Sequence, residues 1–433
     1  MSKRKINVVT LGCSKNVVDS EYLMRQLEVD GWDVIFDSND TSARVVVINT
    51  CGFIADAQEE SIDTILSFVE AKEQGKIDKI FVMGCLSQRF REDLIDEIPE
   101  VDGFFGVTDL PEILKSLNTK LSNSHQNQRF ITTPNHYAYL KISEGCSWGC
   151  SYCAIPLIRG KHVSKPIPDL LEEAQYLVNQ GVKELILIAQ DSTFYGKDIY
   201  GSRKLPELIN ELSTIDGLEW IRIHYAYPKG FPLELLNVMR SNPKVCKYID
   251  IPFQHISTGV LKAMRRGINR QETIEFIETL RREVPGIAIR TTLLVGHPGE
   301  TEADFNELLQ FVKEMKFDRL GVFAYSEEEG THSATLADDV PEEVKQSRVE
   351  QVMELQQQIS LENNRLRLDK VFRVIIDREE EEYYIGRTEF DSPEVDQEVL
   401  IPNNQRHILK SGDFIECRIV DVADYDLYGE IIS

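Results

Sequence analysis

The sequence predicts an α/β protein of three parts: an N-terminal parallel βαβ domain, a central partial (β/α)6 barrel and a small C-terminal all-β barrel. Apolar strand-like runs alternate with amphipathic helices through most of the chain, whereas its last part reads as strands alone. A length of 433 residues exceeds one ordinary domain. The composition, 42% apolar and 28% charged, is typical of a globular protein and excludes a disordered or fibrous chain.

The N-terminal domain is expected over residues 1–120. Its apolar strands alternate with amphipathic helices, a pattern typical of buried parallel βαβ units. The expected strands are 6–13, 43–52 and 79–85, and the expected helices are 20–31 and 58–76. Residues 121–136 are polar and rich in Asn, Ser and Gln, which predicts a linker.

The central barrel is expected over residues 137–366. Six strand–helix units in roughly 190 residues favour a partial barrel over an eightfold one. A long exit helix is expected from about Pro341 to Leu368, with the proline in its first turn. The expected strands are 139–146, 183–191, 220–228, 248–255, 287–299 and 319–330. Residues 367–433 then contain several short strand-like runs, which predict a β-barrel of about five strands.

Three cysteines, Cys146, Cys150 and Cys153, lie within eight residues in the run GCSWGCSYC, at the end of the first predicted barrel strand. A structural zinc site normally takes four ligands, and the next candidate, His162, is nine residues further on. Three thiolates on one tight loop suit a [4Fe–4S] cluster that leaves one iron open to a small molecule. The spacing therefore predicts an iron–sulfur site.

Three further cysteines, Cys13, Cys51 and Cys85, each end one of the first three predicted strands. The carboxyl ends of parallel strands share one edge of a sheet, so we expect these thiols to converge. A second three-thiolate cluster explains this placement better than three coincidental buried cysteines. Cys246 and Cys417 belong to neither group of cysteines and are expected to be small buried hydrophobic residues.

Other polar groups are given structural interpretations. The Gly-rich turn GHPGE at 296–300 is expected to be structural, although it could approach a ligand. The histidines at 224, 255 and 297 follow predicted strand ends, so they either line the pocket or are satisfied structural side chains. The basic cluster of Lys262, Arg265 and Arg266 is interpreted as solvated surface rather than as a substrate contact.

The charge and hydropathy patterns limit the partners. The formal net charge is −24, so direct binding of free nucleic acid is not expected. No apolar run reaches the roughly 18 residues that span a bilayer, and the N-terminus lacks the apolar core of a signal peptide. A cytoplasmic protein without membrane contact is therefore expected.

The CxxxCxxC motif on a β/α barrel resembles the radical S-adenosylmethionine (SAM) superfamily. This resemblance implies that Cys146, Cys150 and Cys153 hold a [4Fe–4S] cluster whose open iron binds the amino and carboxylate groups of SAM. It also implies that Tyr152, the aromatic residue before the third cysteine, lines the adenine pocket. Active sites of such barrels lie at the carboxyl ends of the strands, where the motif falls.

Over its whole length the chain resembles the radical-SAM methylthiotransferase family. The resemblance is carried by LGCSKN, NTCGF and MGC in the N-terminal domain, by EGCSWGCSYCAIPLIRG and VGHPGETE in the radical-SAM barrel, and by a C-terminal barrel similar to a TRAM domain. It implies two [4Fe–4S] clusters, the second held by Cys13, Cys51 and Cys85. One cluster delivers an electron to SAM, giving a 5′-deoxyadenosyl radical that removes hydrogen from an unreactive C–H bond. The other cluster carries the sulfur to be inserted, and another SAM supplies the methyl group. A reductase or flavodoxin-like electron donor is expected.

The family splits by substrate. One branch modifies an adenosine derivative in transfer RNA, and the other modifies the β-carbon of an aspartate in small-subunit ribosomal protein S-twelve. Residues 368–433 carry 17 acidic and 7 basic side chains, including four consecutive glutamates at 379–382. An acidic barrel repels RNA and complements a basic ribosomal protein, either free or assembled in the small subunit. This balance favours the protein-modifying branch.

An alternative from another functional class is an iron–sulfur carrier or electron-transfer protein. A carrier needs neither a SAM pocket nor a domain for substrate docking. The complete barrel therefore argues against this alternative.

Overall fold

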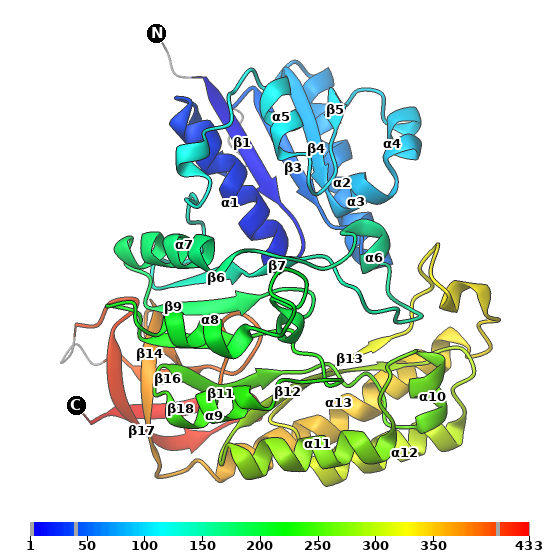
Figure 1. Ribbon diagram of the computed structural model, residues 1–433, viewed down its shortest axis with the longest axis vertical. Helices are drawn as coiled ribbons and strands as arrows, with labels where there is room; N and C mark the ends of the chain where they lie inside the picture. Colours follow the sequence, from blue (N-terminus) through cyan, green and yellow to red (C-terminus); the bar gives the residue numbers. More distant parts are fainter. Residues whose placement is uncertain (1–3, 39–41, 404–407, 433) are drawn as a thin grey trace.

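The computed structural model describes residues 4–38, 42–403 and 408–432 and consists of three units (Figure 1). The N-terminal α/β unit lies at one end, and the C-terminal barrel lies beside the central sheet in the other half of the molecule (Figure 1). The predicted fold class, two parallel α/β units and a small closed barrel, is confirmed. Among the described residues, no helix is long and apolar enough to cross a membrane.

The N-terminal unit is a five-stranded parallel sheet in the order β2-β1-β3-β4-β5. Apolar side chains of the strands are buried on both faces, against α1 and α5 on one and α2 and α4 on the other. The strand order reverses between β1 and β3, which is where open sheets of this topology bind their ligands. The strands are β1 (Lys5–Thr10), β2 (Asp33–Phe36), β3 (Val45–Thr50), β4 (Lys79–Gly84) and β5 (Gly103–Phe104), and the helices are α1 (Ser14–Val29), α2 (Ala55–Glu73), α3 (Cys85–Arg89), α4 (Arg91–Glu97) and α5 (Leu110–Ser116).

The central unit is a six-stranded parallel sheet in the order β13-β12-β11-β10-β9-β6, as a partial (β/α)6 barrel requires. The strands are β6 (Tyr137–Lys141), β9 (Glu184–Ile188), β10 (Trp220–Ile223), β11 (Val245–Asp250), β12 (Ala288–Val295) and β13 (Arg319–Ala324). The main helices are α7 (Ile167–Asn179), α8 (Leu205–Leu212), α9 (Glu234–Ser241), α11 (Arg270–Glu283), α12 (Glu302–Met315) and α13 (Glu342–Arg365). Short elements are β7 (Ser143–Glu144), α6 (Ile155–Ile158), β8 (Val163–Ser164), η2 (Ser192–Phe194), α10 (Thr258–Ala263) and η3 (Ser333–Thr335).

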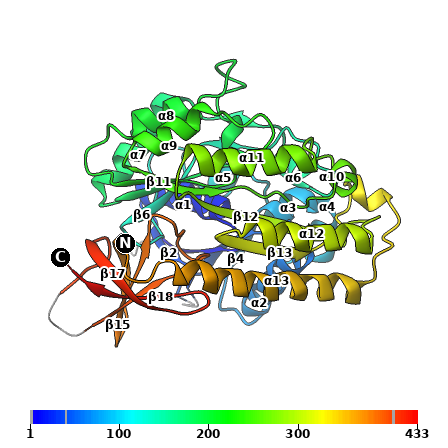
Figure 2. The same cartoon turned by 90° about the horizontal axis from the view of Figure 1, so that it is seen from below.

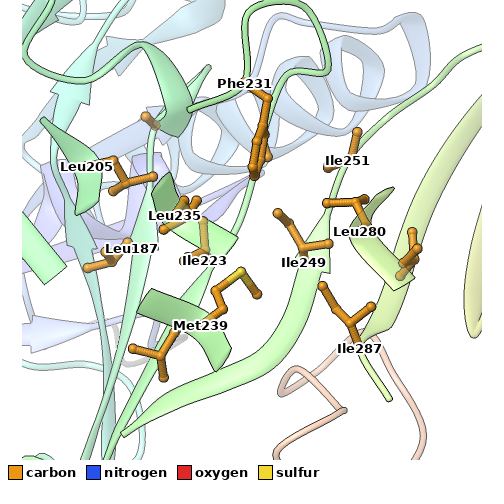
Figure 3. Packing of buried hydrophobic residues seen from close by; sticks show 14 of the residues in the cluster. Leu187, Leu205, Ile223, Phe231, Leu235, Met239, Ile249, Ile251, Leu280 and Ile287 are labelled. Atoms are coloured by element: carbon orange, nitrogen blue, oxygen red, sulfur yellow. The ribbon is translucent and has the colours of Figure 1, made fainter. Parts of the chain in front are cut away.

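The outer face of the central sheet forms the largest apolar core. Alternate strand residues such as Leu187, Ile223 and Ile249 pack against helix residues such as Leu235 and Leu280 (Figure 3). Side chains on alternate positions face the opposite side of a strand. The inner face therefore receives the intervening residues, many of them polar, and can hold a site.

The C-terminal unit is a closed barrel in the order β14-β15-β16-β18-β17, and it lies at one end of α13 (Figure 2). Its strands are β14 (Val371–Glu379), β15 (Tyr383–Thr388), β16 (Val399–Pro402), β17 (Phe414–Val422) and β18 (Leu427–Ile431). The loop between β15 and β16 enters the open inner side of the central sheet. Glu394 accepts hydrogen bonds from Tyr137 and Tyr139 of β6, while Asp391 pairs with Arg319 of β13. The loop thus contacts both edges of the partial barrel.

The segment that joins the first two units contains η1 (Asn123–His125) and packs closely against its neighbours. Arg129, only 1% exposed, forms ion pairs with Glu21 of α1 at 3.1 Å and with Glu173 of α7 at 3.0 Å. Its guanidinium also donates to the carbonyl oxygen of Tyr139 at 2.5 Å. This connection therefore ties the N-terminal unit to the central one.

Candidate active site

The N-terminal cysteines lie at the carboxyl edge of three adjacent strands. Cys13 caps α1 directly after β1, Cys51 follows β3, and Cys85 begins α3 after β4. Burial raises the pKa of the Cys85 thiol to about 11, and negative charge on Cys13 or Cys51 raises it further. Burial likewise raises the pKa of Cys51, with Cys13 adding to the effect. The three predicted residues therefore share one electrostatic environment.

Glycines beside these cysteines allow the chain segments to approach one another. A Cβ atom on Gly12 would lie 2.7 Å from the Cβ atom of Cys51, and Gly12 has a φ of +89°, which favours glycine. A Cβ atom on Gly52 would lie 2.6 Å from the backbone nitrogen of Leu86. Contacts this short do not occur between a real Cβ atom and the backbone. The glycines of LGC and NTCG are thus needed to bring the cysteine loops together.

The second cysteine group lies on the loop that follows β6 and β7. The backbone N–H of Cys146 donates to the carbonyl of Gly160 at 3.0 Å, and that of Cys153 donates to the carbonyl of Cys150 at 3.3 Å. Burial raises the pKa of Cys146 to about 11 and that of Cys153 to about 12. A charge on Cys150 contributes to both increases. The loop is therefore closed by its own backbone, with its thiols gathered at one place.

Arg266 contacts this cysteine loop directly. Its Nη1 atom lies 3.5 Å from the Sγ of Cys150 and 3.4 Å from the hydroxyl of Tyr152. Its guanidinium also stacks 4.3 Å from the ring centroid of Tyr227, whose hydroxyl lies 3.6 Å from the same Sγ. A buried cation beside three thiols favours their deprotonated form.

The interpretation of the basic cluster as solvated surface is therefore wrong for Arg266, which is only 3% exposed. It holds for Lys262 and Arg265, which are exposed. Arg265 takes a left-handed conformation, with a φ of 57°, just beyond α10, and this turn directs the following side chain inward. Helical spacing does not reveal such a turn.

A single short helix, α6, separates the two cysteine groups. Cys85 packs in one buried cluster with Ala154, which follows Cys153, and with Ile158 of α6. Arg159 at the end of α6 brings its Nη2 atom 3.4 Å from the Sγ of Cys85 and 2.6 Å from the Oδ1 of Asn16. The segment Ala154–Arg159 thus connects the loop of the second cysteine group to Cys85 of the first.

Arg159 and Asn16 were not among the residues predicted from the sequence. Both are buried, and the other guanidinium nitrogen of Arg159 forms ion pairs with Asp19 and Glu144 at 3.2 and 2.9 Å. The run CAIPLIRG places an arginine close behind the cysteines, which is a signal, but only the packing of two units shows its target. Arg159 is the cation that faces the N-terminal thiols.

A cavity of about 780 Å³ opens between the two α/β units. This volume is within the usual range for small-molecule sites. Tyr152 lines it, as do Phe53 beside the Cys51 loop and Phe323 on β13. Gln254 and Thr292, from the inner side of the central sheet, supply polar groups. Both cysteine groups therefore have a neighbouring residue in the wall of one cavity.

The three predicted histidines are buried and hydrogen-bonded within the protein. The Nε2 atom of His224 lies 2.9 Å from the hydroxyl of Ser392, and the Nδ1 atom of His255 accepts from the backbone N–H of Ser257 at 3.0 Å. His297 bonds to the Ser333 hydroxyl at 2.9 Å. The structural interpretation of these histidines is thus the better one.

The donor sets fit iron–sulfur clusters. Each group offers three free thiols and no other protein ligand in the same loops, which is what a [4Fe–4S] cluster with one open iron requires. In the part of the chain that the structure describes, no three His, Cys, Asp or Glu side chains converge closely enough to hold a single metal ion. The cysteines of a cluster bind different iron atoms, so they stand further apart than the ligands of one ion.

Known sequence families match each unit of the chain. The radical SAM superfamily matches residues 140–312, the uncharacterized protein family UPF0004 matches residues 5–106, and the TRAM domain matches residues 370–432. A solved radical SAM methyltransferase, TsrM from Kitasatospora setae, superposes with a TM-score of 0.54 at 14% identity, covering 74% of this chain and 75% of that one. Fold and family together define a radical SAM enzyme, which uses an iron–sulfur cluster and SAM.

Full-length relatives are more specific. The chain is 54% identical over 431 residues to the ribosomal protein uS12 methylthiotransferase RimO of Flavobacterium johnsoniae, covering 99% of this chain and 98% of the relative. It is 55% identical over 433 residues to the protein of that name from Christiangramia forsetii, covering 100% and 95%. The chain therefore belongs to the ribosomal protein uS12 methylthiotransferase family. The resemblance predicted from the cysteine groups and the two barrels is confirmed.

Proposed function

We propose that this enzyme inserts sulfur and a methyl group at the β-carbon of an aspartate in ribosomal protein uS12. The observation that carries the proposal is the pair of three-thiol groups that the segment Ala154–Arg159 connects. Activation of a C–H bond and delivery of sulfur are separate tasks, and two centres whose neighbouring residues line one cavity suit a reaction that combines them. The names of the full-length relatives supply the substrate.

We assign the SAM-binding cluster to Cys146, Cys150 and Cys153, and the second cluster to Cys13, Cys51 and Cys85. When bound, the first cluster with SAM supplies the 5′-deoxyadenosyl radical, and the second supplies the sulfur. Charged and aromatic side chains of the protein lie beside both proposed cluster sites. Arg266 and Arg159 put positive charge beside the thiols, while Trp148 stacks on Tyr227 at 4.2 Å beside the first group. Tyr152 in the cavity wall is assigned to the adenine.

The units divide the work in this proposal. Residues 1–120 carry the sulfur site, 121–136 connect, 137–366 carry the radical site and its exit helix, and 367–433 dock the substrate. The four glutamates 379–382 are exposed and, with Tyr383, line an open hollow of about 800 Å³. This surface complements a basic ribosomal protein. A cytoplasmic enzyme served by a reductase or flavodoxin-like donor completes the proposal.

Anaerobically reconstituted enzyme, offered uS12 and transfer RNA together with SAM and a reductant, tests this function. Mass spectrometry should find the thiomethyl group on an aspartate of uS12 and none on the RNA. Product on RNA would favour the adenosine-modifying alternative. Bound iron and sulfide without 5′-deoxyadenosine would favour an iron–sulfur carrier.

A further inference from the structure

Lys15 is a buried cation that lacks an anionic partner. It lies in the first turn of α1, two residues after Cys13, and is only 8% exposed. Its ammonium group forms no ion pair or hydrogen bond with any residue that the structure describes. The neighbouring buried cations Lys141 and Arg159, by contrast, both pair with Asp19 and Glu144.

The ammonium group of Lys15 contacts an aromatic ring. Its Nζ atom lies 3.0 Å from the ring centroid of Tyr225, which follows β10 on the central unit. A cation–π contact offsets only part of the cost of burying an ion. The contact therefore holds the ammonium in place without replacing a counter-charge, and the position favours an incoming anion.

Tyr225 is itself fixed in an unusual conformation. Its φ of 57° is left-handed, which is rare for a large aromatic residue. Its backbone N–H donates to Asp250 at 3.3 Å, and its carbonyl accepts from the backbone of Ser192 at 2.9 Å. These bonds hold the ring across the unit boundary, directly against Lys15.

Lys15 contacts the central unit rather than the N-terminal cysteines. Arg159 is the cation that faces Cys51 and Cys85. The charge of Lys15 instead acts on His224 inside the central unit, where it helps to lower the pKa of that imidazole. Lys15 thus extends from the N-terminal cysteine group toward the inner side of the central barrel.

We infer that Lys15 binds the side-chain carboxylate of the substrate aspartate, an inference that rests on the proposed function. In aspartate the β-carbon is bonded directly to the carboxyl carbon, so a cation that holds the carboxylate also positions the carbon that reacts. The same contact selects aspartate over asparagine, because the neutral amide leaves the buried ammonium without a counter-charge. Lys15 is then a determinant of specificity as well as a binding group.

The test compares two substrates with four enzymes. The substrates are uS12 and uS12 with its target aspartate changed to asparagine, and the enzymes are the unmodified protein, Lys15→Met, Lys15→Arg and the control Lys79→Met. Lys79 is exposed at the opposite edge of the N-terminal sheet. Measurements are the dissociation constant of each substrate, kcat/KM, iron content, the reduction potentials of the clusters, and SAM cleavage without substrate.

Lys15→Met should lower kcat/KM for the aspartate substrate by at least about 30-fold and bring the aspartate-to-asparagine ratio close to one. Lys15→Arg should keep most of that ratio, and Lys79→Met all of it, while iron content and uncoupled SAM cleavage stay unchanged. If Lys15→Met loses iron, Lys15→Gln carries the same comparison.

An unchanged ratio in the Lys15 variants would overturn the inference while leaving the proposed function intact. A shifted cluster potential with an unchanged ratio would overturn it as well, because Lys15 would then serve the cluster. If the unmodified enzyme leaves uS12 unchanged, the proposed function fails, and the inference fails with it.

Discussion

Cysteine substitutions separate the two sites at the scale of single residues. Cys150→Ala removes one of three thiols and the partner of Arg266, so we expect loss of the SAM-binding cluster and of all SAM cleavage, by more than about 100-fold. Cys51→Ala should leave SAM cleavage detectable while stopping formation of the thiomethyl product. Iron content, 5′-deoxyadenosine yield and product mass measure these outcomes. Normal product from Cys51→Ala would show that the N-terminal group is structural.

The six cysteines of the candidate site could be predicted because local spacing and strand ends place them. Lys15, Arg159 and Arg266 could not, because each acts across a contact between distant segments. Arg266 reaches Cys150 from 116 positions away, and Arg159 reaches Cys85 from 74. In the sequence such residues look like ordinary surface cations. Their roles follow only from burial, which the packing of two units decides.

His224 should give the fold an acid-sensitive component. Burial, together with the charges of Arg222 and Arg290, holds its pKa well below the ordinary value of about 6.5. Below that pH the unfolded chain binds a proton that the folded site refuses. The free energy of unfolding should therefore fall on acidification, by up to about 1.4 kcal/mol per pH unit from this group.

His224→Gln should remove this component from the pH dependence of stability. The measurement is urea unfolding at several pH values between about 5 and 7.5, and the matched control is His332→Gln, since His332 is exposed. The slope should flatten for the first variant alone. Equal slopes in both variants would contradict a neutral buried His224.

At the scale of elements, the connecting segment acts as a strap. Arg129→Met leaves the buried Glu21 without its counter-charge and Glu173 with Lys165 alone, which should cost about 3–5 kcal/mol of stability. Arg44→Met is the matched control, because Arg44 and its partner Asp78 are both exposed and the substitution should cost less than about 1 kcal/mol. Denaturant unfolding of the cluster-free chain compares the two variants. Similar small losses would mean that residues 121–136 are a passive linker.

The elements differ in how far the sequence predicted them. Long apolar strands such as β3 and β12 and amphipathic helices were predicted because their periodicity is local. The edge strands β2 (Asp33–Phe36) and β5 (Gly103–Phe104) were missed, since each is short and the first is partly exposed. The β15–β16 loop also carried no local signal. Its path is decided by Arg319 and Tyr139 on the central sheet, which pair with its acidic side chains.

At the scale of the whole molecule, charge is distributed by unit. Residues 368–433, which contain the C-terminal barrel, hold 17 acidic and 7 basic side chains. Part of this negative charge is neutralised within the protein, because Asp391 and Asp396 form ion pairs with arginines of the central unit. The four glutamates 379–382 remain at the surface, and of these Glu380 pairs with Arg378. A basic partner would therefore meet the exposed carboxylates of these glutamates.

Replacing these four glutamates with lysine should slow modification of uS12. Exposed charges mainly raise the rate of association, and they are screened beyond about 8 Å at physiological salt. We therefore expect kcat/KM for uS12 to fall roughly 10-fold at low ionic strength and little at high ionic strength, with SAM cleavage unchanged. Replacing them with glutamine, which removes charge without reversing it, should give an intermediate loss. If the transfer-RNA alternative holds, the lysine variant should instead bind and modify RNA faster. A competition between uS12 and transfer RNA at two salt concentrations decides between these outcomes, because the two substrates respond to the same substitution with opposite sign.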